Sequence, residues 1–168
     1  LSGNREGSLL KAVDRTVTGS GARLLAERLT APLTDPDAIS IRLDCVGFLR
    51  GEARLRDGLR TVLARAPDIA RALSRLALNR GGPRDLAAIR SGLTAAADCA
   101  ALLADVELPG QLDAVRRALQ DFPAELAGQL DRALADELPL LRRDGGFVRP
   151  STMPNWTRCA RWPASPAR

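Results

Sequence analysis

The side chains of this sequence that could carry acid–base chemistry are aspartates and arginines, because the chain contains neither histidine nor tyrosine. Without histidine, Ser-His and Cys-His nucleophiles and histidine-ligated metals are excluded. The remaining candidates lie near one another in the sequence: Asp68, Asp85 and Asp144 with Arg71, Arg75 and Arg84. Such residues commonly cap helices or form surface ion pairs. We therefore interpret them as structural, and we predict no catalytic, cofactor-binding or metal site.

Cysteine and lysine offer little further chemistry. The cysteines are Cys45, Cys99 and Cys159, and their odd number and wide spacing fit neither a disulfide framework nor a zinc site. We expect Cys45 and Cys99, which lie among apolar residues, to pack as small hydrophobic side chains in a reducing compartment. The single lysine, Lys11, is followed by Ala12, and Gly-x-x-x-x-Gly-Lys-Ser/Thr does not occur. The sequence therefore predicts a protein that is not an enzyme by itself.

Charge and composition indicate a globular chain. Lysine and arginine number 25 against 20 acidic residues, and hydrophobic residues make up 45%. Most of the excess positive charge lies in residues 151–168, so the rest of the chain is nearly balanced and lacks the clustered basic charge typical of a nucleic-acid-binding face. We find no signal-peptide layout and no continuous apolar run near the ~18 residues needed to span a bilayer. These features predict a cytoplasmic protein without membrane contact.

Apolar residues recur at steps of three and four almost throughout, which predicts an all-α fold. Prolines stand at probable helix starts rather than in helix interiors, in agreement with this periodicity. Expected caps are Thr18 or Ser20 for the second helix and Asp35 for the third. The expected helices lie at about 8–13, 18–31, 35–51, 68–80, 83–104, 109–122 and 123–138, with a further helix after Gly51 that carries Leu55, Leu59, Val62 and Leu63.

Three segments carry more detailed expectations. Ile39, Leu43, Val46 and Leu49 mark the apolar face of the third helix, and Leu86, Ile89, Leu93, Ala96, Ala100 and Leu103 form a long stripe on the sixth. The spacing of Leu126, Leu130, Leu134 and Leu138 predicts one helix, with its stripe in the core rather than at an oligomer seam. Asp144-Gly145-Gly146 predicts a tight turn into an extended segment at Phe147–Val148, whose partner strand is not evident.

Residues 151–168 break the compositional trends of the chain. They contain Met153, Trp156 and Trp162, but no leucine, isoleucine or valine. One interpretation is an interaction tail, because tryptophan and arginine are enriched at binding hot spots. The other is a frameshift near Pro150, because a GC-rich back-translation read one base earlier can encode a helix-like sequence with Glu-Leu-Asp-Glu. We favour the frameshift, and predict one domain over 1–150 followed by a non-native, disordered tail over 151–168.

Three ordered stretches carry a more specific signal. The first includes Asp14-Arg15-Thr16-Val17-Thr18, Gly21, Arg23, Leu24 and Pro32-Leu33. The second includes Asp68-Ile69-Ala70-Arg71, Arg75-Leu76-Ala77-Leu78 and Pro83-Arg84-Asp85-Leu86, and the third is Asp144-Gly145-Gly146. Together they resemble the MutS family of DNA mismatch-repair proteins, with Leu-Asp-x-Thr-x-Thr-x-x-Gly-x-Arg-x-Leu, Asp-x-Glu-Arg and Pro-Arg-Asp-Leu segments. Arg28 and Ala70 depart from the tryptophan and glutamate that family members often have.

The resemblance implies that residues 1–150 are the first half of the helical core, or lever, domain of a larger machine. That machine would also have a mismatch-reading domain, a DNA clamp and an ATPase that uses ATP and Mg²⁺, and it would act as a homodimer. The reader's Phe-x-Glu is missing here, since Phe48, Phe122 and Phe147 are followed at the second position by Arg50, Ala124 and Arg149.

The chain would then bind DNA only through domains outside it, and would link ATPase and clamp as a structural and allosteric element. The alternative is an independent all-helical adaptor that binds a partner protein through an apolar face. Both hypotheses predict an exposed apolar patch.

Overall fold

The computed structural model describes residues 7–121 and 123–152, and it confirms the all-α fold. Within these residues there is no β-strand, and Leu134 and Val148 form an isolated antiparallel bridge. The α-helices are α1 (Leu9–Val13), α2 (Gly19–Thr30), α3 (Pro36–Gly51), α4 (Ala53–Arg65), α5 (Ile69–Ala77), α6 (Pro83–Leu103), α7 (Gly110–Gln120) and α8 (Ala124–Ala133). Two 3₁₀ helices follow, η1 (Arg142–Asp144) and η2 (Pro150–Thr152).

The predicted tail lies almost wholly outside the described residues, and so does Cys159. The domain boundary at residue 150 stays a prediction.

The helices begin where the sequence provides a cap. Ser8 and Thr18 each accept a hydrogen bond from the backbone N–H three residues later, at 3.2 Å and 2.9 Å. Asp35 accepts from the N–H two residues later at 3.1 Å. Each bond satisfies a first-turn N–H that has no partner inside the helix. Of the two candidates for the second helix, Thr18 rather than Ser20 is the cap.

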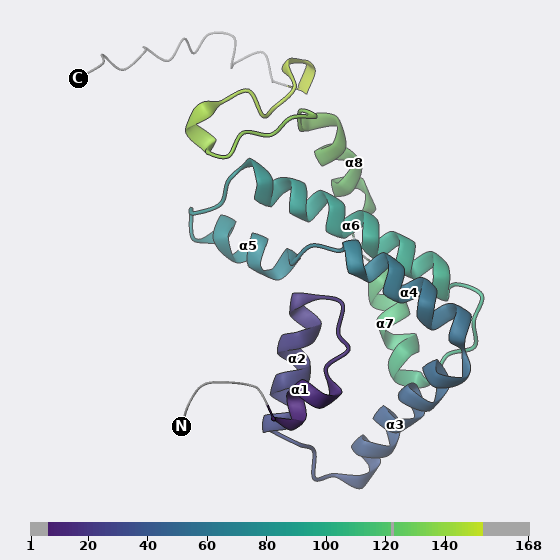
Figure 1. The fold of residues 1–168 in the computed structure, drawn as a ribbon. Helices are drawn as coiled ribbons and strands as arrows, with labels where there is room; N and C mark the ends of the chain where they lie inside the picture. The colour runs from purple at the N-terminus through teal and green to yellow at the C-terminus, as the bar shows by residue number, and fades with distance from the viewer. Residues whose placement is uncertain (1–6, 122, 153–168) are drawn as a thin grey trace.

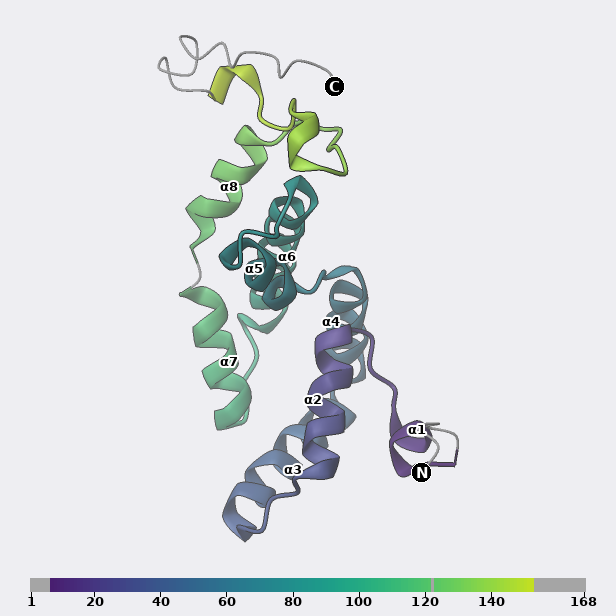
Figure 2. The same cartoon turned by 90° about the vertical axis from the view of Figure 1, so that its left-hand side faces the viewer.

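Helix α6 is the centre of the fold. Helices α4, α5, α7 and α8 all pack against it, and Figure 2 shows α7 and α8 along one side with α4 on the other. Ala72 of α5 and Ile89 and Leu93 of α6 form the buried core cluster. The predicted stripe of α6 therefore faces the core, with Ile89, Leu93 and Leu103 buried.

Close packing between α5 and α6 depends on a glycine. Gly92 of α6 is buried, and a Cβ atom at this position would overlap Cγ1 and Cδ1 of Ile69. Because glycine has no Cβ, the first turn of α5 can approach the α6 backbone directly. This contact fixes the position of α5 along α6.

Helix α6 is also, among the described helices, the one that is long and apolar enough to cross a bilayer, with a mean hydropathy of 1.4. The prediction from continuous apolar runs did not find this segment, because Arg90 and Asp98 interrupt it. Four helices pack against α6, and two of its side chains belong to the core cluster. We therefore interpret it as the core helix of the bundle.

The prediction of one helix through the leucine stripe is wrong at its C-terminal end. Helix α8 ends at Ala133, and Leu134 is extended with φ −83° and ψ 138°. Beyond it, the backbone N–H of Ala135 donates to the Phe147 carbonyl at 2.9 Å. Leu134 is still the most buried leucine, at 1% exposure, but it reaches the interior from extended backbone rather than from the helix.

The same contacts confirm the extended segment predicted after the Gly-Gly turn. Gly145 and Gly146 have φ of 66° and 71°, which glycine adopts without strain, and they turn the chain back. The backbone N–H of Arg149 donates to the Ala133 carbonyl at 2.8 Å. The partner of this segment therefore precedes the turn, next to the end of α8.

The predicted apolar face of α3 does not pack within the chain. Leu43 and Val46 are 61% and 62% exposed, and Ile39 is exposed as well. The buried residue of this helix is Cys45, which lies on the side away from Leu43. A helix face that is apolar and unburied is the exposed patch that both functional hypotheses predict.

Candidate functional site

Asp85, one of the predicted structural aspartates, joins α5 to α6. Its Oδ1 accepts a hydrogen bond from Arg75 Nε at 2.8 Å and a second, shorter one from Arg75 Nη2. Its Oδ2 accepts from the backbone N–H of Gly82 at 2.9 Å, which caps α6. The Arg75 bonds hold the pKa of this nearly buried carboxyl below its usual value, aided by the Gly82 N–H and opposed by burial. Asp85 is therefore a charged tie between two helices, and its oxygens are already occupied.

Asp68 makes a similar connection between α2 and α5. Its Oδ1 accepts from the backbone N–H of Arg71 at 3.2 Å, which caps α5. Its Oδ2 accepts from Arg23 Nη2 at 2.7 Å and lies 3.6 Å from Arg71 Nε. The hydrogen bond from Arg23 is the main cause of the lowered pKa of Asp68. This carboxylate is also used in structure.

The remaining candidates are capping or solvent-exposed groups. Asp144 Oδ2 accepts from the backbone N–H of Leu141 at 3.2 Å at the start of η1, and Arg84 is exposed. The three aspartates thus stand at the starts of three different helices. Within the residues that the structure describes, no group of three or more Cys, Asp or Glu side chains could hold a metal ion. Cys45 and Cys99 are buried free cysteines, in agreement with their predicted role as small hydrophobic residues.

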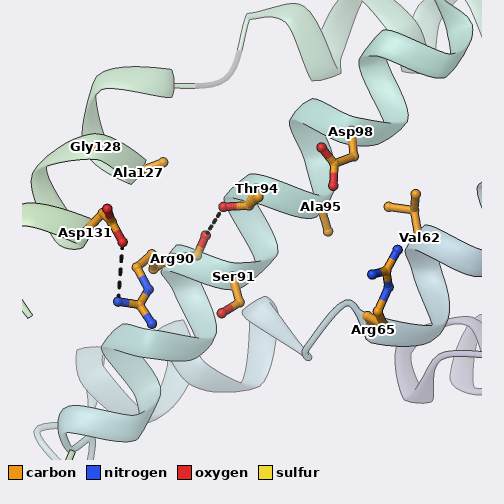
Figure 3. Close-up of a pocket in the computed structure, with 10 residues that line it drawn as sticks. All are labelled: Val62, Arg65, Arg90, Ser91, Thr94, Ala95, Asp98, Ala127, Gly128 and Asp131. Atoms are coloured by element: carbon orange, nitrogen blue, oxygen red, sulfur yellow. Dashed lines mark hydrogen bonds and ion pairs between the residues drawn. The ribbon is translucent and has the colours of Figure 1, made fainter. Parts of the chain in front are cut away.

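An open groove with a volume of about 520 Å³ lies over α6 (Figure 3). Figure 3 shows the α4 side and the α8 side with α6 between them. The floor residues come from α6 and the walls from α4 and α8: Arg90, Ser91, Thr94, Ala95 and Asp98; Val62 and Arg65; Ala127, Gly128 and Asp131.

The lining of this groove combines charged side chains of both signs with small apolar residues. Arg90 Nη1 lies 3.6 Å from Asp131 Oδ1, which links α6 to α8 across the groove. Thr94 Oγ1 donates to the Arg90 carbonyl at 3.2 Å, so this hydroxyl is bonded to its own helix. No side chain among the lining residues is a histidine, cysteine or lysine, and the arrangement has no activated nucleophile.

Sequence reasoning did not find the groove residues. Arg65, Arg90, Asp98 and Asp131 belong to three helices and to no short motif. Only a weak signal in the sequence of α6 indicates the groove, namely the small and polar residues that interrupt its apolar stripe on one side.

Comparison with known proteins places this fold in a family. The family model of MutS domain III matches residues 1–155. The DNA mismatch repair protein MutS of Rhizobium meliloti (strain 1021) is 58% identical over 149 residues, which cover 89% of this chain and 16% of that protein. The chain thus spans less than a fifth of the length of this relative. On both findings the chain belongs to the MutS family, and it corresponds to domain III of that family.

Proposed function

We propose that this chain is a structural element of a MutS-type DNA mismatch-repair protein, and that it transmits movement between the ATPase and the DNA clamp of the whole protein. The observation that carries the proposal is the 58% identity to a protein named for mismatch repair. Binding of mismatched DNA, hydrolysis of ATP with Mg²⁺, homodimer formation and a cytoplasmic location would be properties of the whole protein.

The packing of α6 supports a role in transmission. A helix of 21 residues is about 30 Å long, so a small tilt at one end becomes a displacement at the other. Four helices hold α6 along this length, and the α5–α6 contact at Gly92 leaves no room for local adjustment. Packed elements of this kind shift between discrete arrangements instead of deforming smoothly.

The exposed face of α3 supports contact with other parts of a larger protein. Leu43 and Val46 are more than half exposed, and isolated monomers rarely leave adjacent large aliphatic side chains uncovered. An independent adaptor would show the same feature. The family match favours the interpretation as one part of a repair protein.

A chimera tests the proposal directly. Residues 1–149 of this chain would replace the matching segment of the Rhizobium meliloti protein, and purified protein would be assayed for binding to mismatched and matched DNA, with and without ATP. We expect the chimera to prefer mismatched DNA and to release it on ATP binding. Gly92→Ala in the chimera should weaken this effect of ATP on DNA release, and Gly47→Ala, which alters an open position in α3, should not.

Two results would contradict the proposal. One is a folded chimera in which Gly92→Ala leaves the effect of ATP on DNA binding unchanged. The other is ATP hydrolysis by the isolated chain of 168 residues, which would require a nucleotide site within it.

A further inference from the structure

Helices α1 and α2 are attached to the fold differently from the other helices. Among the described helices, α2 packs closely only against α1, and neither contains a buried residue. Figure 1 shows the pair standing beside the bundle, with α2 below α5. Leu9 and Leu24 are 65% and 46% exposed. Hydrophobic burial therefore contributes little to the position of this pair, residues 7–30, which we call the arm.

Polar contacts cross from the arm to the bundle at two places. Arg23 Nη2 on α2 donates to Asp68 Oδ2 at the start of α5, at 2.7 Å. Arg60 Nη1 on α4 donates to the carbonyl oxygen of Arg15, in the loop between α1 and α2, at 2.9 Å. Arg23 and Asp68 retain 45% and 23% side-chain exposure, so water and salt reach this pair. Exposed ion pairs are weak and are screened by salt.

We propose that the arm is a hinged element, that the Arg23–Asp68 pair is the ionic latch that holds it to the bundle, and that residues 31–35 are the hinge. The hinge joins two helices, and its residues Ala31, Pro32 and Thr34 are exposed. The hydrogen bond from Arg60 to the Arg15 carbonyl also supports the docked position, and its acceptor carries no charge. Because the arm buries little apolar surface, loss of one ion pair changes the balance of docked and undocked forms measurably. The proposal concerns the chain alone and does not rest on the proposed function.

The Arg23–Asp68 latch is connected to the core of the bundle through α5. Asp68 both receives Arg23 and caps α5, and α5 packs directly on α6 at Gly92. A partner that binds the arm, or competes for Arg23, would act on the start of α5. A contact that the arm makes outside the bundle would thus affect the start of α5.

The double role of Asp68 allows a selective test. Asn is as good an N-cap as Asp, so Asp68→Asn keeps the start of α5 and removes the charge that holds Arg23. Arg71→Gln is the matched control: it removes another cationic partner of Asp68, at 3.6 Å, but that partner lies on α5 itself. Spin labels on ketone-bearing unnatural amino acids at the exposed positions Glu27 (α2) and Ala97 (α6) would leave the cysteines unmodified.

Double electron–electron resonance then gives the distance distribution between arm and core in the full chain. We expect Asp68→Asn to raise the ratio of undocked to docked distances by about two- to fivefold, the range of an exposed ion pair. Raising the salt concentration to about 1 M should do the same in the unmodified chain and in Arg71→Gln, and should have little further effect in Asp68→Asn.

A distance distribution for Asp68→Asn that matches the unmodified chain at every salt concentration would overturn the proposal. If circular dichroism showed that Asp68→Asn had lost its helices, Arg23→Gln would replace it, because Arg23 caps no helix. An unchanged distribution in Arg23→Gln would be equally decisive against the latch.

Discussion

Gly92→Ala should destabilise the chain even though alanine is the better helix former. A Cβ at this buried position would overlap the Ile69 side chain, and Pro67 Cγ would lie 3.7 Å away on the same side. The gain from helix propensity is about 1 kcal/mol. Overpacking in a well-packed interior costs about 1–3 kcal/mol. The expected net change is therefore a loss of up to about 2 kcal/mol in the free energy of unfolding.

Two other helix-interior glycines are matched controls. A Cβ at Gly47 in α3 would meet nothing within 4 Å, and one at Gly58 in α4 would lie 3.6 Å from Leu102, an ordinary contact. Both Gly→Ala substitutions should stabilise the chain by up to about 1 kcal/mol. Since the helix-propensity gain is common to all three, the difference between Gly47→Ala and Gly92→Ala should equal the overpacking cost of about 1–3 kcal/mol.

Urea unfolding followed by far-UV circular dichroism measures these differences, provided that the dependence on urea is the same in each variant. Ile69→Ala removes the atoms that a Cβ at Gly92 would meet. In a double-mutant cycle, Ile69→Ala and Gly92→Ala should therefore couple favourably by about 1–3 kcal/mol. If Gly92→Ala stabilised the chain as much as Gly47→Ala, or if the coupling were absent, the packing of α5 on α6 described here would be wrong.

Three further substitutions or reactions test other contacts. Asp85→Asn should lower the free energy of unfolding at neutral pH and make its fall in acid shallower. Arg75 holds the pKa of Asp85 below its usual 3.8. The stabilisation from the Arg75–Asp85 pair is therefore fully present above pH 3.8 and is lost as the pH falls through the pKa of the folded state. Thermal unfolding measured across this pH range tests the difference between the two chains. Leu134→Ala should cost about 2–5 kcal/mol in urea unfolding, and Leu126→Ala, at a site that is 38% exposed, clearly less. Equal losses would contradict the burial of Leu134. Burial raises the pKa of the Cys99 thiol, so in a Cys45→Ser, Cys159→Ser background its reaction with a thiol reagent at neutral pH should be slow until the chain unfolds. Fast labelling of this folded variant would contradict the burial of Cys99.

The features predicted well from the sequence are those decided within a few residues. The starts of α2 and α3 follow from Thr18 and Asp35, because a cap and the N–H that it satisfies lie two or three residues apart. The stripe of α6 was also predictable, since a helix with neighbours on several sides needs apolar residues at Ile89 and Leu93. In these cases local and tertiary preferences agree.

The errors arose where a distant segment competed with the local pattern. The leucine spacing favours a helix through Leu138. Instead, α8 ends at Ala133, because the backbone on either side of Leu134 forms hydrogen bonds with Phe147 and Arg149. The sequence shows the period of α3 but not whether another surface covers Leu43. The groove over α6 was invisible for a similar reason: its charged residues are brought together only by the packing of three helices.

The family-like stretches acquire a physical meaning from their contacts. Arg23 belongs to the first stretch and Asp68 to the second, and their pair ties α2 to α5. Arg75 and Asp85 both belong to the second stretch, and their pair ties α5 to α6. Each aspartate also caps the helix that it anchors, because one carboxylate oxygen accepts from the arginine and the other accepts from a backbone N–H at the helix start. These residues set the positions of α2, α5 and α6 relative to one another, which is a reason for a motif that requires no catalysis.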